Sequence, residues 1–214
     1  MKLKTILACS LLIAAGSLAA DSTPVMGSLF TPVQAPSSDY DVTGVRLSLI
    51  YGDCQNFKGL DLGLVNHADG EFSGLAIGGA NIADGSFCGA QVGLVNWNGY
   101  HSEDWAGRSI GVQLGALNYT DSFCGLQDGL VNVSGSSFSG LQAGLVNYAD
   151  DMYGVQCGAY FILGVNIAGG SVYGCQLGLV NYAGTMERGL QIGIVNIIAR
   201  NGWLPVLPII NGNF

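Results

Sequence analysis

Few side chains of this 214-residue sequence are of the types that carry out chemistry. Its two histidines, His67 and His101, stand in no HExxH motif and in no other spaced cluster of metal ligands. The stretch from Gly135 to Ser139 departs from the GxSxG nucleophile motif at its last position, and no P-loop for phosphate binding occurs. We therefore expect a protein that is not an enzyme and that has no catalytic, cofactor-binding or metal site.

An insertion between Asn96 and Gly111 is the best candidate for a binding site. Its candidate binding residues are His101, Glu103, Asp104 and Trp105. Repeat proteins place insertions as loops on one face, which is often the binding face. A solvated surface loop without a ligand is the plainer interpretation. The sequence thus predicts where an unknown surface ligand would bind, but not what it is.

Aspartates recur in the predicted turns and allow two interpretations. They are Asp69, Asp84, Asp121, Asp150 and Asp151. Carboxylate oxygens are ligands that Ca²⁺ prefers, so one edge lined by them could hold calcium. Asp also favours turns because its side chain hydrogen-bonds the local backbone. The nonapeptide calcium motif is absent, so the turn role is favoured.

A repeated octapeptide, Gly-x-Gln-x-Gly-x-x-Asn, organises the chain around these residues. Its nine copies begin at Gly59, Gly74, Gly89, Gly111, Gly125, Gly140, Gly154, Gly174 and Gly189. Glycine fills the first and fifth positions in every copy. The seventh copy is interrupted after Gly158 by an apolar insertion and regains its ending at Asn166. Tandem repetition of this kind indicates a repeat architecture.

Each copy predicts one strand. Apolar residues at positions two, four and six alternate with Gly, Gln and Gly, which is the two-residue period of a strand. Two glycines in five positions would cost a helix about 1 kcal/mol each. The third position is Gln in seven copies, with Asp61 and Ala76 as exceptions: Gln91, Gln113, Gln127, Gln142, Gln156, Gln176 and Gln191. The eighth position is Asn in eight copies: Asn66, Asn81, Asn96, Asn118, Asn132, Asn147, Asn181 and Asn196.

These strands fit two all-β architectures. In a β-solenoid each copy is one coil, the strands stack in parallel about 4.8 Å apart, and the Gln and Asn side chains form structural amide ladders. In the alternative, the copies form an antiparallel meander that closes into an outer-membrane barrel. Asp-Gly turns and the terminal Phe214 favour the barrel. The connections do not alternate between short and long, however, and Asn recurs at one end of every strand. We therefore predict a β-solenoid of about nine coils of 14–15 residues.

Four regions are predicted along the chain. Residues 1–20 have the basic start, the apolar run and the small-residue end of a signal peptide. Residues 21–40 are rich in Pro, Ser and Thr and are expected to be a linker. A lead strand at 41–52 opens the β repeat domain, which extends from 41 to 201. Residues 202–214 contain two prolines and are expected to cap the open edge of the last repeat.

Aromatic and cysteine side chains recur beside the strands and are expected in the core. The aromatic residues that precede copies are Phe72, Phe87, Phe123, Phe138, Tyr153 and Tyr173. Five cysteines remain after the predicted signal peptide, and none has CxxC spacing, so we interpret them as small buried hydrophobes. Cys157 and Cys175 occupy positions four and two of adjacent coils, about 8 Å apart by strand geometry. We therefore expect no disulfide between them.

The charge of the chain argues against nucleic acid as a partner. Without Lys2 and Lys4, which lie in the predicted signal peptide, five basic residues face fifteen acidic ones, a net charge of about −10. No basic stripe is present to neutralise phosphates.

The repeated octapeptide resembles a family of bacterial surface-repeat proteins, spirochaete proteins among them. The predicted signal peptide, the lead strand ending in Tyr51-Gly52 and the Leu-Pro-x-Leu-Pro tail belong to the resemblance, which covers residues 42–214. It implies an exported or outer-surface location and no enzymatic activity. We expect a non-enzymatic surface repeat protein with a structural or adhesive role and an unknown surface ligand or envelope component as partner. Outer-membrane association, self-association and a periplasmic location stay open. The alternative is a small outer-membrane barrel that serves as an anchor or pore.

Overall fold

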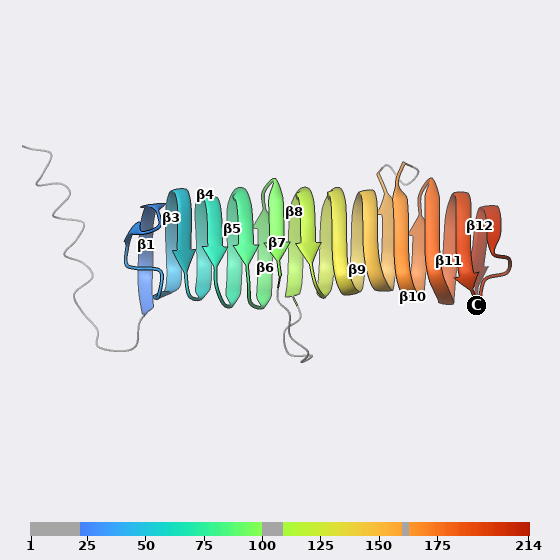
Figure 1. The fold of residues 1–214 in the computed structure, drawn as a ribbon, viewed down its shortest axis with the longest axis horizontal. Helices are drawn as coiled ribbons and strands as arrows, with labels where there is room; N and C mark the ends of the chain where they lie inside the picture. The colour runs from blue at the N-terminus through green and yellow to red at the C-terminus, as the bar shows by residue number, and fades with distance from the viewer. Residues whose placement is uncertain (1–21, 100–108, 160–162) are drawn as a thin grey trace, which may run out of the picture.

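The computed structural model describes residues 22–99, 109–159 and 163–214, which form a rod of stacked coils (Figure 1). All regular secondary structure in these residues is β-strand. Across the same three ranges, no helix is long and apolar enough to cross a membrane. The predicted signal peptide, residues 1–20, lies outside the described residues.

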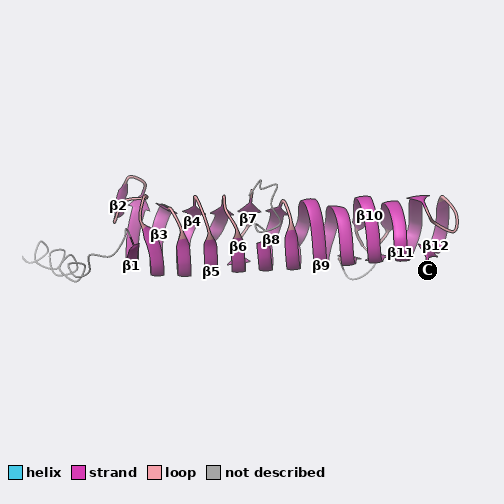
Figure 2. Ribbon diagram, turned by 90° about the horizontal axis from the view of Figure 1, so that it is seen from below, coloured by secondary structure: helices cyan, strands magenta, loops and turns pink. Residues whose placement is uncertain are grey.

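The strands follow one another along the rod in nearly sequential order. Their order in the sheet is β12-β11-β10-β9-β8-β6-β5-β4-β3-β1-β2, with β7 beside β5 and β8. The bounds are β1 Ser22–Phe30, β2 Val33–Ala35, β3 Asp41–Cys54, β4 Phe57–Ala68, β5 Phe72–Ala83, β6 Phe87–Val92, β7 Val95–Asn98, β8 Ser109–Thr120, β9 Phe123–Gly158, β10 Val165–Leu177, β11 Val180–Arg200 and β12 Val206–Asn213. The turned view in Figure 2 shows the same stacking.

Neighbouring coils pair in parallel, with equivalent residues side by side. Between β4 and β5, Gly59 lies beside Gly74 and Asn66 beside Asn81. The same register joins β8 to β9 and β10 to β11. An antiparallel meander would instead place equivalent positions at alternate ends of the strands. The predicted β-solenoid is therefore confirmed and the barrel alternative is wrong, so the anchor or pore role that depended on the barrel loses its basis.

The interior is a narrow column of aromatic, small and amide side chains. Gln at position three, Asn at position eight and mostly Ala at position ten point inward. Two residues before the first Gly, five coils carry a buried Phe, and the rings stack with centroids 5.2 to 6.5 Å apart. The prediction that the aromatic residues are core holds for these Phe residues. It is wrong for Tyr153 and Tyr173, which lie one residue closer to the Gly and are 45% and 44% exposed.

A change in the inward-pointing positions marks a corner in every coil. Position three points inward, and after the corner positions eight and ten do so. In an unbroken strand the inward-pointing positions would be either all odd-numbered or all even-numbered, because successive side chains alternate between the two faces. The chain therefore turns near the fifth and sixth positions. One flat side of the rod, the first side, displays positions two and four, and the other, the second side, displays positions seven and nine.

The backbone conformation of the coil requires glycine at the first position of each copy. Gly125 has a φ of +143°, a conformation that residues with a Cβ rarely adopt. A Cβ on Gly125 would lie 2.0 Å from the carbonyl oxygen of Gly111 in the adjacent coil. The same positive φ recurs at the first Gly of all nine copies, from Gly59 to Gly189. These glycines permit the close approach of neighbouring coils.

Short strands cover both ends of the rod. The linker predicted for residues 21–40 is wrong for most of that stretch, because β1 pairs in parallel with β3 and then antiparallel with β2. Met26 and Ser28 of β1 are buried between exposed neighbours, so this strand closes the open edge of the first coil. Its Pro and Ser content concealed that alternation. At the other end, β12, within residues 202–214, pairs antiparallel with β11 over the last repeat.

Replacing Gly125 by Ala is expected to destabilise the fold by more than about 2 kcal/mol, because the new Cβ would meet the Gly111 carbonyl at an unfavourable φ. Gly27→Ala in β1 is the matched control, since a Cβ there meets nothing within 4 Å. Urea unfolding followed by far-UV circular dichroism measures both variants. Equal stabilities of the two variants would contradict the role assigned to the first glycine.

Candidate functional site

The structure does not place the predicted binding residues. His101, Glu103, Asp104 and Trp105 lie outside the described residues. The strands that flank this insertion, β7 and β8, pair side by side. The described chain therefore stops at residue 99 in one coil and resumes at residue 109 in the neighbouring coil. Three groups of described residues are regular or concentrated enough to matter for function: the interior amides, a polar cluster around His67, and the outer surface.

The Asn residues form one ladder through the interior. Each Nδ2 donates to Oδ1 of the Asn in the next coil toward the C-terminus, at 2.8 to 2.9 Å, from Asn66 to Asn196. Asn166 keeps the row continuous at the interrupted seventh copy. The amides also donate to the backbone of the next coil, as Asn132 does to the Ala143 carbonyl at 2.8 Å. The ladder thus brings together all eight Asn residues named from the sequence.

The Gln residues form a second ladder that donates in the opposite direction. From Gln113 to Gln191, each Nε2 donates to Oε1 of the Gln in the preceding coil, at 2.7 to 3.0 Å. At its N-terminal end Gln91 donates to Asn98 at 3.2 Å, since Ala76 of the preceding coil offers no amide. All seven predicted Gln side chains are buried in this continuous row.

Asp61, which departs from the Gln pattern, forms a buried ion pair with Arg46. The two residues are register partners in β4 and β3. Nε and Nη2 of Arg46 donate to the two carboxylate oxygens at 2.8 and 2.6 Å, and both side chains are fully buried. Nη1 donates to the His67 carbonyl oxygen at 2.7 Å, and the guanidinium lies 5.3 Å from the ring centre of Phe57. The departure at Asp61 is therefore matched by a partner in the adjacent coil.

Burial and pairing act in opposite directions on this ion pair. Burial alone would lower the pKa of Arg46, but the hydrogen bonds and charge of Asp61 outweigh it and raise that pKa. Burial raises the pKa of Asp61, against the hydrogen bonds from Arg46, which lower it. Since a guanidinium keeps its proton, protonating Asp61 would leave an unpaired buried charge. The ionised pair is the state that the geometry supports.

A polar cluster surrounds His67 at the N-terminal end of the rod. Nδ1 of His67 lies 2.8 Å from the Tyr51 hydroxyl, 3.0 Å from Asp53 and 3.7 Å from Asp69, and Nε2 lies 3.1 Å from Asp84. Within the described ranges, Asp53, His67 and Asp69 are the one group of three or more His, Cys, Asp or Glu ligand atoms within 4.8 Å of one another. Burial, followed by the charge of Asp69, raises the pKa of Asp53.

The ligand types of the His67 cluster would suit a cation. The Asp53 contact is an ion pair without the geometry of a good hydrogen bond, so it is favourable when Nδ1 is protonated. Since His67 already contacts Tyr51 and the carboxylates of neighbouring coils, we assign no metal to the cluster. This grouping was not predicted from the sequence. The one-coil spacing of the residues, with Asp53 beside His67 and Asp84 fifteen residues after Asp69, was the signal that could have revealed it.

The outer surface of the rod is unusually apolar. Position six forms a row of side chains along one long edge, the apolar ridge: Leu64, Leu94, Leu130, Leu145, Leu179 and Ile194. These residues are 37% to 69% exposed. On the flat sides, positions two, four and seven are also almost entirely aliphatic, with Asp128 as their one charged residue across the nine copies. The strands therefore direct amides inward and aliphatic side chains outward.

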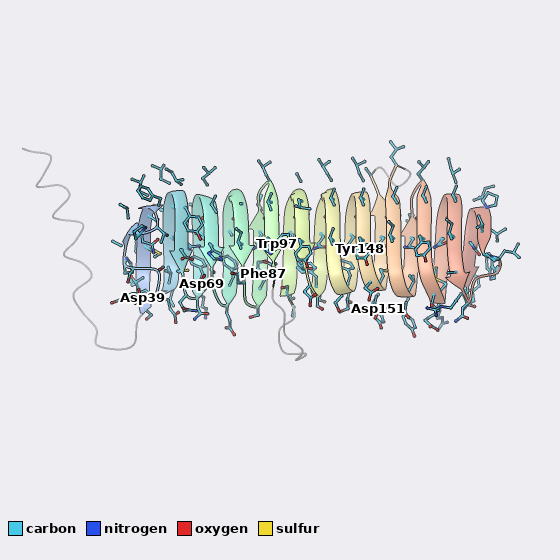
Figure 3. The ribbon with its side chains drawn as sticks, viewed as in Figure 1. Asp39, Asp69, Phe87, Trp97, Tyr148 and Asp151 are labelled. Carbon is cyan, nitrogen blue, oxygen red and sulfur yellow. The ribbon has the colours of Figure 1, made fainter. Side chains whose placement is uncertain are left out.

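The opposite long edge is acidic. It carries the turn aspartates Asp69, Asp84, Asp121, Asp150 and Asp151, named the acidic edge. Figure 3 shows carbon-only side chains along the upper edge of the rod and oxygen-bearing side chains along the lower edge, where Asp69 and Asp151 are labelled. Between the edges, on the second side, position nine is aromatic in four copies: Trp97, Tyr119, Tyr148 and Tyr182. Trp97 and Tyr119 stack with centroids 4.0 Å apart. The rod is thus amphipathic across its width.

The cysteines do not share one environment. Cys54 is buried, and burial raises the pKa of its thiol to about 12, whereas Cys88 is exposed, against the expectation of buried hydrophobes. Cys175 lies beside Val155, and Cys157 beside Leu177. The two cysteines are thus offset by two residues along neighbouring strands, which is the register predicted from the repeat.

Asp61→Asn is expected to lower the free energy of unfolding by about 3–5 kcal/mol, because it leaves the charge of Arg46 buried and unpaired. The double variant Arg46→Gln/Asp61→Gln is the control. It removes both charges and supplies the amides that the ladder uses in later coils, so it should recover most of the loss. Chemical denaturation measures both. An Asp61→Asn variant as stable as the parent would exclude a strong pair.

Asn132→Leu is expected to destabilise the protein more than Asn66→Leu, by about 1–2 kcal/mol. Both variants remove an amide that donates along the ladder, but only Asn132 also accepts a hydrogen bond, from Asn118 at 2.8 Å. Oδ1 of Asn66, at the ladder end, accepts none. Parallel urea titrations give the difference. A larger loss in the free energy of unfolding for Asn66→Leu would contradict the role assigned to the hydrogen bond that Asn132 accepts.

Comparison with known proteins gives no match for this chain among protein-family models, curated proteins or solved structures. The resemblance to bacterial surface-repeat proteins therefore stays a prediction, and the function has to be argued from the residues.

Proposed function

We propose that this chain is an exported, non-enzymatic repeat protein of the bacterial cell surface, with a structural or adhesive role that it performs through its apolar outer surface. The observation that carries the proposal is the outward direction of the aliphatic side chains, led by the apolar ridge. Soluble monomers seldom expose one continuous apolar patch larger than a few hundred Å².

The size of this surface supports a binding role. Nine coils spaced about 4.8 Å apart give a length of roughly 43 Å, and positions two to seven span roughly 17 Å of chain. The area of this apolar surface is therefore on the order of 700 Å², which is larger than the largest apolar patch of a typical monomer. Since this surface repeats along the rod, it suits an extended partner better than a small ligand.

The composition of the described residues supports a role without catalysis. Most of the buried amide side chains are engaged in the two ladders, and the buried charges of Arg46 and Asp61 are paired with each other. Among the described residues, the His67 cluster is the one grouping of three or more possible metal ligands, and its side chains contact one another across neighbouring coils. The predicted signal peptide supports export.

Envelope retention tests this proposal. The full 214-residue chain is expressed in a bacterial host with an outer membrane, and the exported product is measured in the washed envelope and in the medium. We expect the parent in the envelope fraction and Leu94→Ser/Leu130→Ser, which removes two ridge side chains, to be released at least about 10-fold more. Tyr153→Ser/Tyr173→Ser is the matched control, since these residues are also exposed but lie away from the ridge.

Two results would contradict the proposal. One is retention of the ridge variant equal to that of the parent, with release caused instead by deleting residues 100–108. That result would transfer the binding role to the predicted loop. The other is a product that stays in the cytoplasm, which would contradict the proposed export.

A further inference from the structure

The apolar ridge is a single line of side chains at the corner of the coils. Leu94 is 69% exposed and Ile194 is 62% exposed, so these side chains stand clear of the rod. The line is uneven, because position six is Gly79 in the second copy, Ala116 in the fourth and Ala159 in the seventh. A partner must therefore follow a ridge with gaps of leucine size.

Polarity rises from the ridge to the acidic edge down both sides of the rod. On the second side, the order is the ridge, then a row of Val, Ala and Leu at position seven, then position nine with Trp97 and Tyr119, then the turn aspartates. On the first side, aliphatic positions four and two come before a mixed row that contains Lys58, Tyr173 and Arg188. The two sides have unrelated sequences, but on both of them polarity increases from the ridge to the acidic edge. A surface that binds one flat partner would require this gradient of polarity on one side only.

Aromatic residues lie where this polarity changes. Position nine is three residues from the ridge, roughly 10 Å by strand spacing. Trp and Tyr have an apolar ring and a polar tip, and they are enriched where an apolar phase meets water. Their place between the ridge and the acidic edge fits a rod that stands edge-first in such a boundary.

The backbone at the ridge can leave water, because its polar groups are paired between coils. Leu94 N–H donates to the Gly79 carbonyl at 2.9 Å, and Val195 N–H donates to the Leu179 carbonyl at 3.0 Å. The Asn ladder adds bonds to the carbonyls of position four, next to the corner, as at Ala143. Hydrocarbon excludes backbone groups that are not satisfied internally. The corner of this solenoid meets that requirement.

We propose that the partner of the apolar ridge is a lipid membrane surface, into which the rod inserts edge-first. The proposal rests on the proposed function, an exported protein that acts through its apolar outer surface. The ridge enters the acyl region, the aromatic residues of position nine lie at headgroup level, and the acidic edge stays in water. This is the interfacial mode of binding, in which apolar side chains enter about 5–10 Å into the headgroup and acyl boundary.

A lipid surface fits the described residues better than a second copy of the chain. Fluid acyl chains fill the gaps at Gly79 and Ala116, whereas a rigid partner needs matching side chains. Asp128, at position four, is exposed in the middle of the aliphatic first side. Packing two copies through that side would bury its carboxylate at a cost. In an edge-first rod Asp128 lies about 7 Å from the ridge, near the headgroups.

Most of the acidic charge lies too far from the ridge to influence this binding strongly, and Asp128 is the one exposed exception. The acidic edge is five residues from the ridge, roughly 16 Å by strand spacing. Fixed charges at that distance are largely screened, because the Debye length at physiological salt is about 8 Å. Zwitterionic and anionic membranes should therefore bind the rod similarly, with weak dependence on salt.

Vesicle flotation tests the proposal with the exported product of the full chain. Vesicles of phosphatidylcholine alone and of phosphatidylcholine with about 30% phosphatidylglycerol are compared at low and high NaCl, spanning the change from weak to strong screening. We expect the parent to float with both kinds, with less than about a two-fold effect of salt. Leu94→Ser/Leu130→Ser should lower the partition coefficient at least about 10-fold, because the variant lacks two leucine side chains that the membrane would otherwise remove from water.

Tyr153→Ser/Tyr173→Ser is the control and should float like the parent, since these exposed residues lie away from the ridge. Far-UV circular dichroism establishes that both variants are folded. No flotation of a folded, monomeric parent overturns the lipid proposal. Binding that disappears at high salt also overturns it, because the attraction would then be electrostatic.

Sedimentation without lipid separates this inference from the proposed function. A parent that forms dimers, does not float, and becomes monomeric in the ridge variant would overturn the lipid partner but keep a binding role for the ridge. Flotation that is equal for parent and ridge variant, together with equal envelope retention, would overturn both proposals.

Discussion

The hydrogen bond between equivalent amides of neighbouring coils is the interaction on which the rest of the structure depends. Asn118 reaches Asn132, and Gln127 reaches Gln113, at 2.8 Å each. An amide ladder of this kind works only when every coil has the same register, because a slip by one residue would turn the amides outward. Since a buried amide without a partner costs about 1–3 kcal/mol, the ladders penalise every other stacking of the coils.

This constraint also explains why the surface is apolar. The interior column is filled by amides, Phe rings and Ala, and glycines bring the coils too close for much else. The aliphatic residues, which favour strands, therefore occupy the outward positions. The Arg46–Asp61 pair then occupies the first two coils of the Gln row, and Ala76 separates that pair from Gln91, so the charges lie at the end of the amide row and not within it.

Much of this fold could be predicted from the repeat, because spacing and register are properties of the sequence itself. Gln142 and Asn147 were assigned to their ladders by position alone. The side on which Leu94 would lie could not be predicted, since an alternation of two residues does not tell which face is inside. The strand at Met26 was missed because its cap role depends on the open edge of another coil. The neighbours of His67 come from three coils, so no local motif marks them.

The opposite directions of the two ladders have a consequence for the length of the rod. Each aligned amide carries a dipole, and a row of them adds up along the axis as peptide units do in a helix. Asn amides donate toward the C-terminus and Gln amides toward the N-terminus, so the two rows oppose each other. Adding a coil extends both rows together, and the partial charges that one row would accumulate at the ends are offset by the other. A solenoid with this interior can gain or lose coils without building up an axial field.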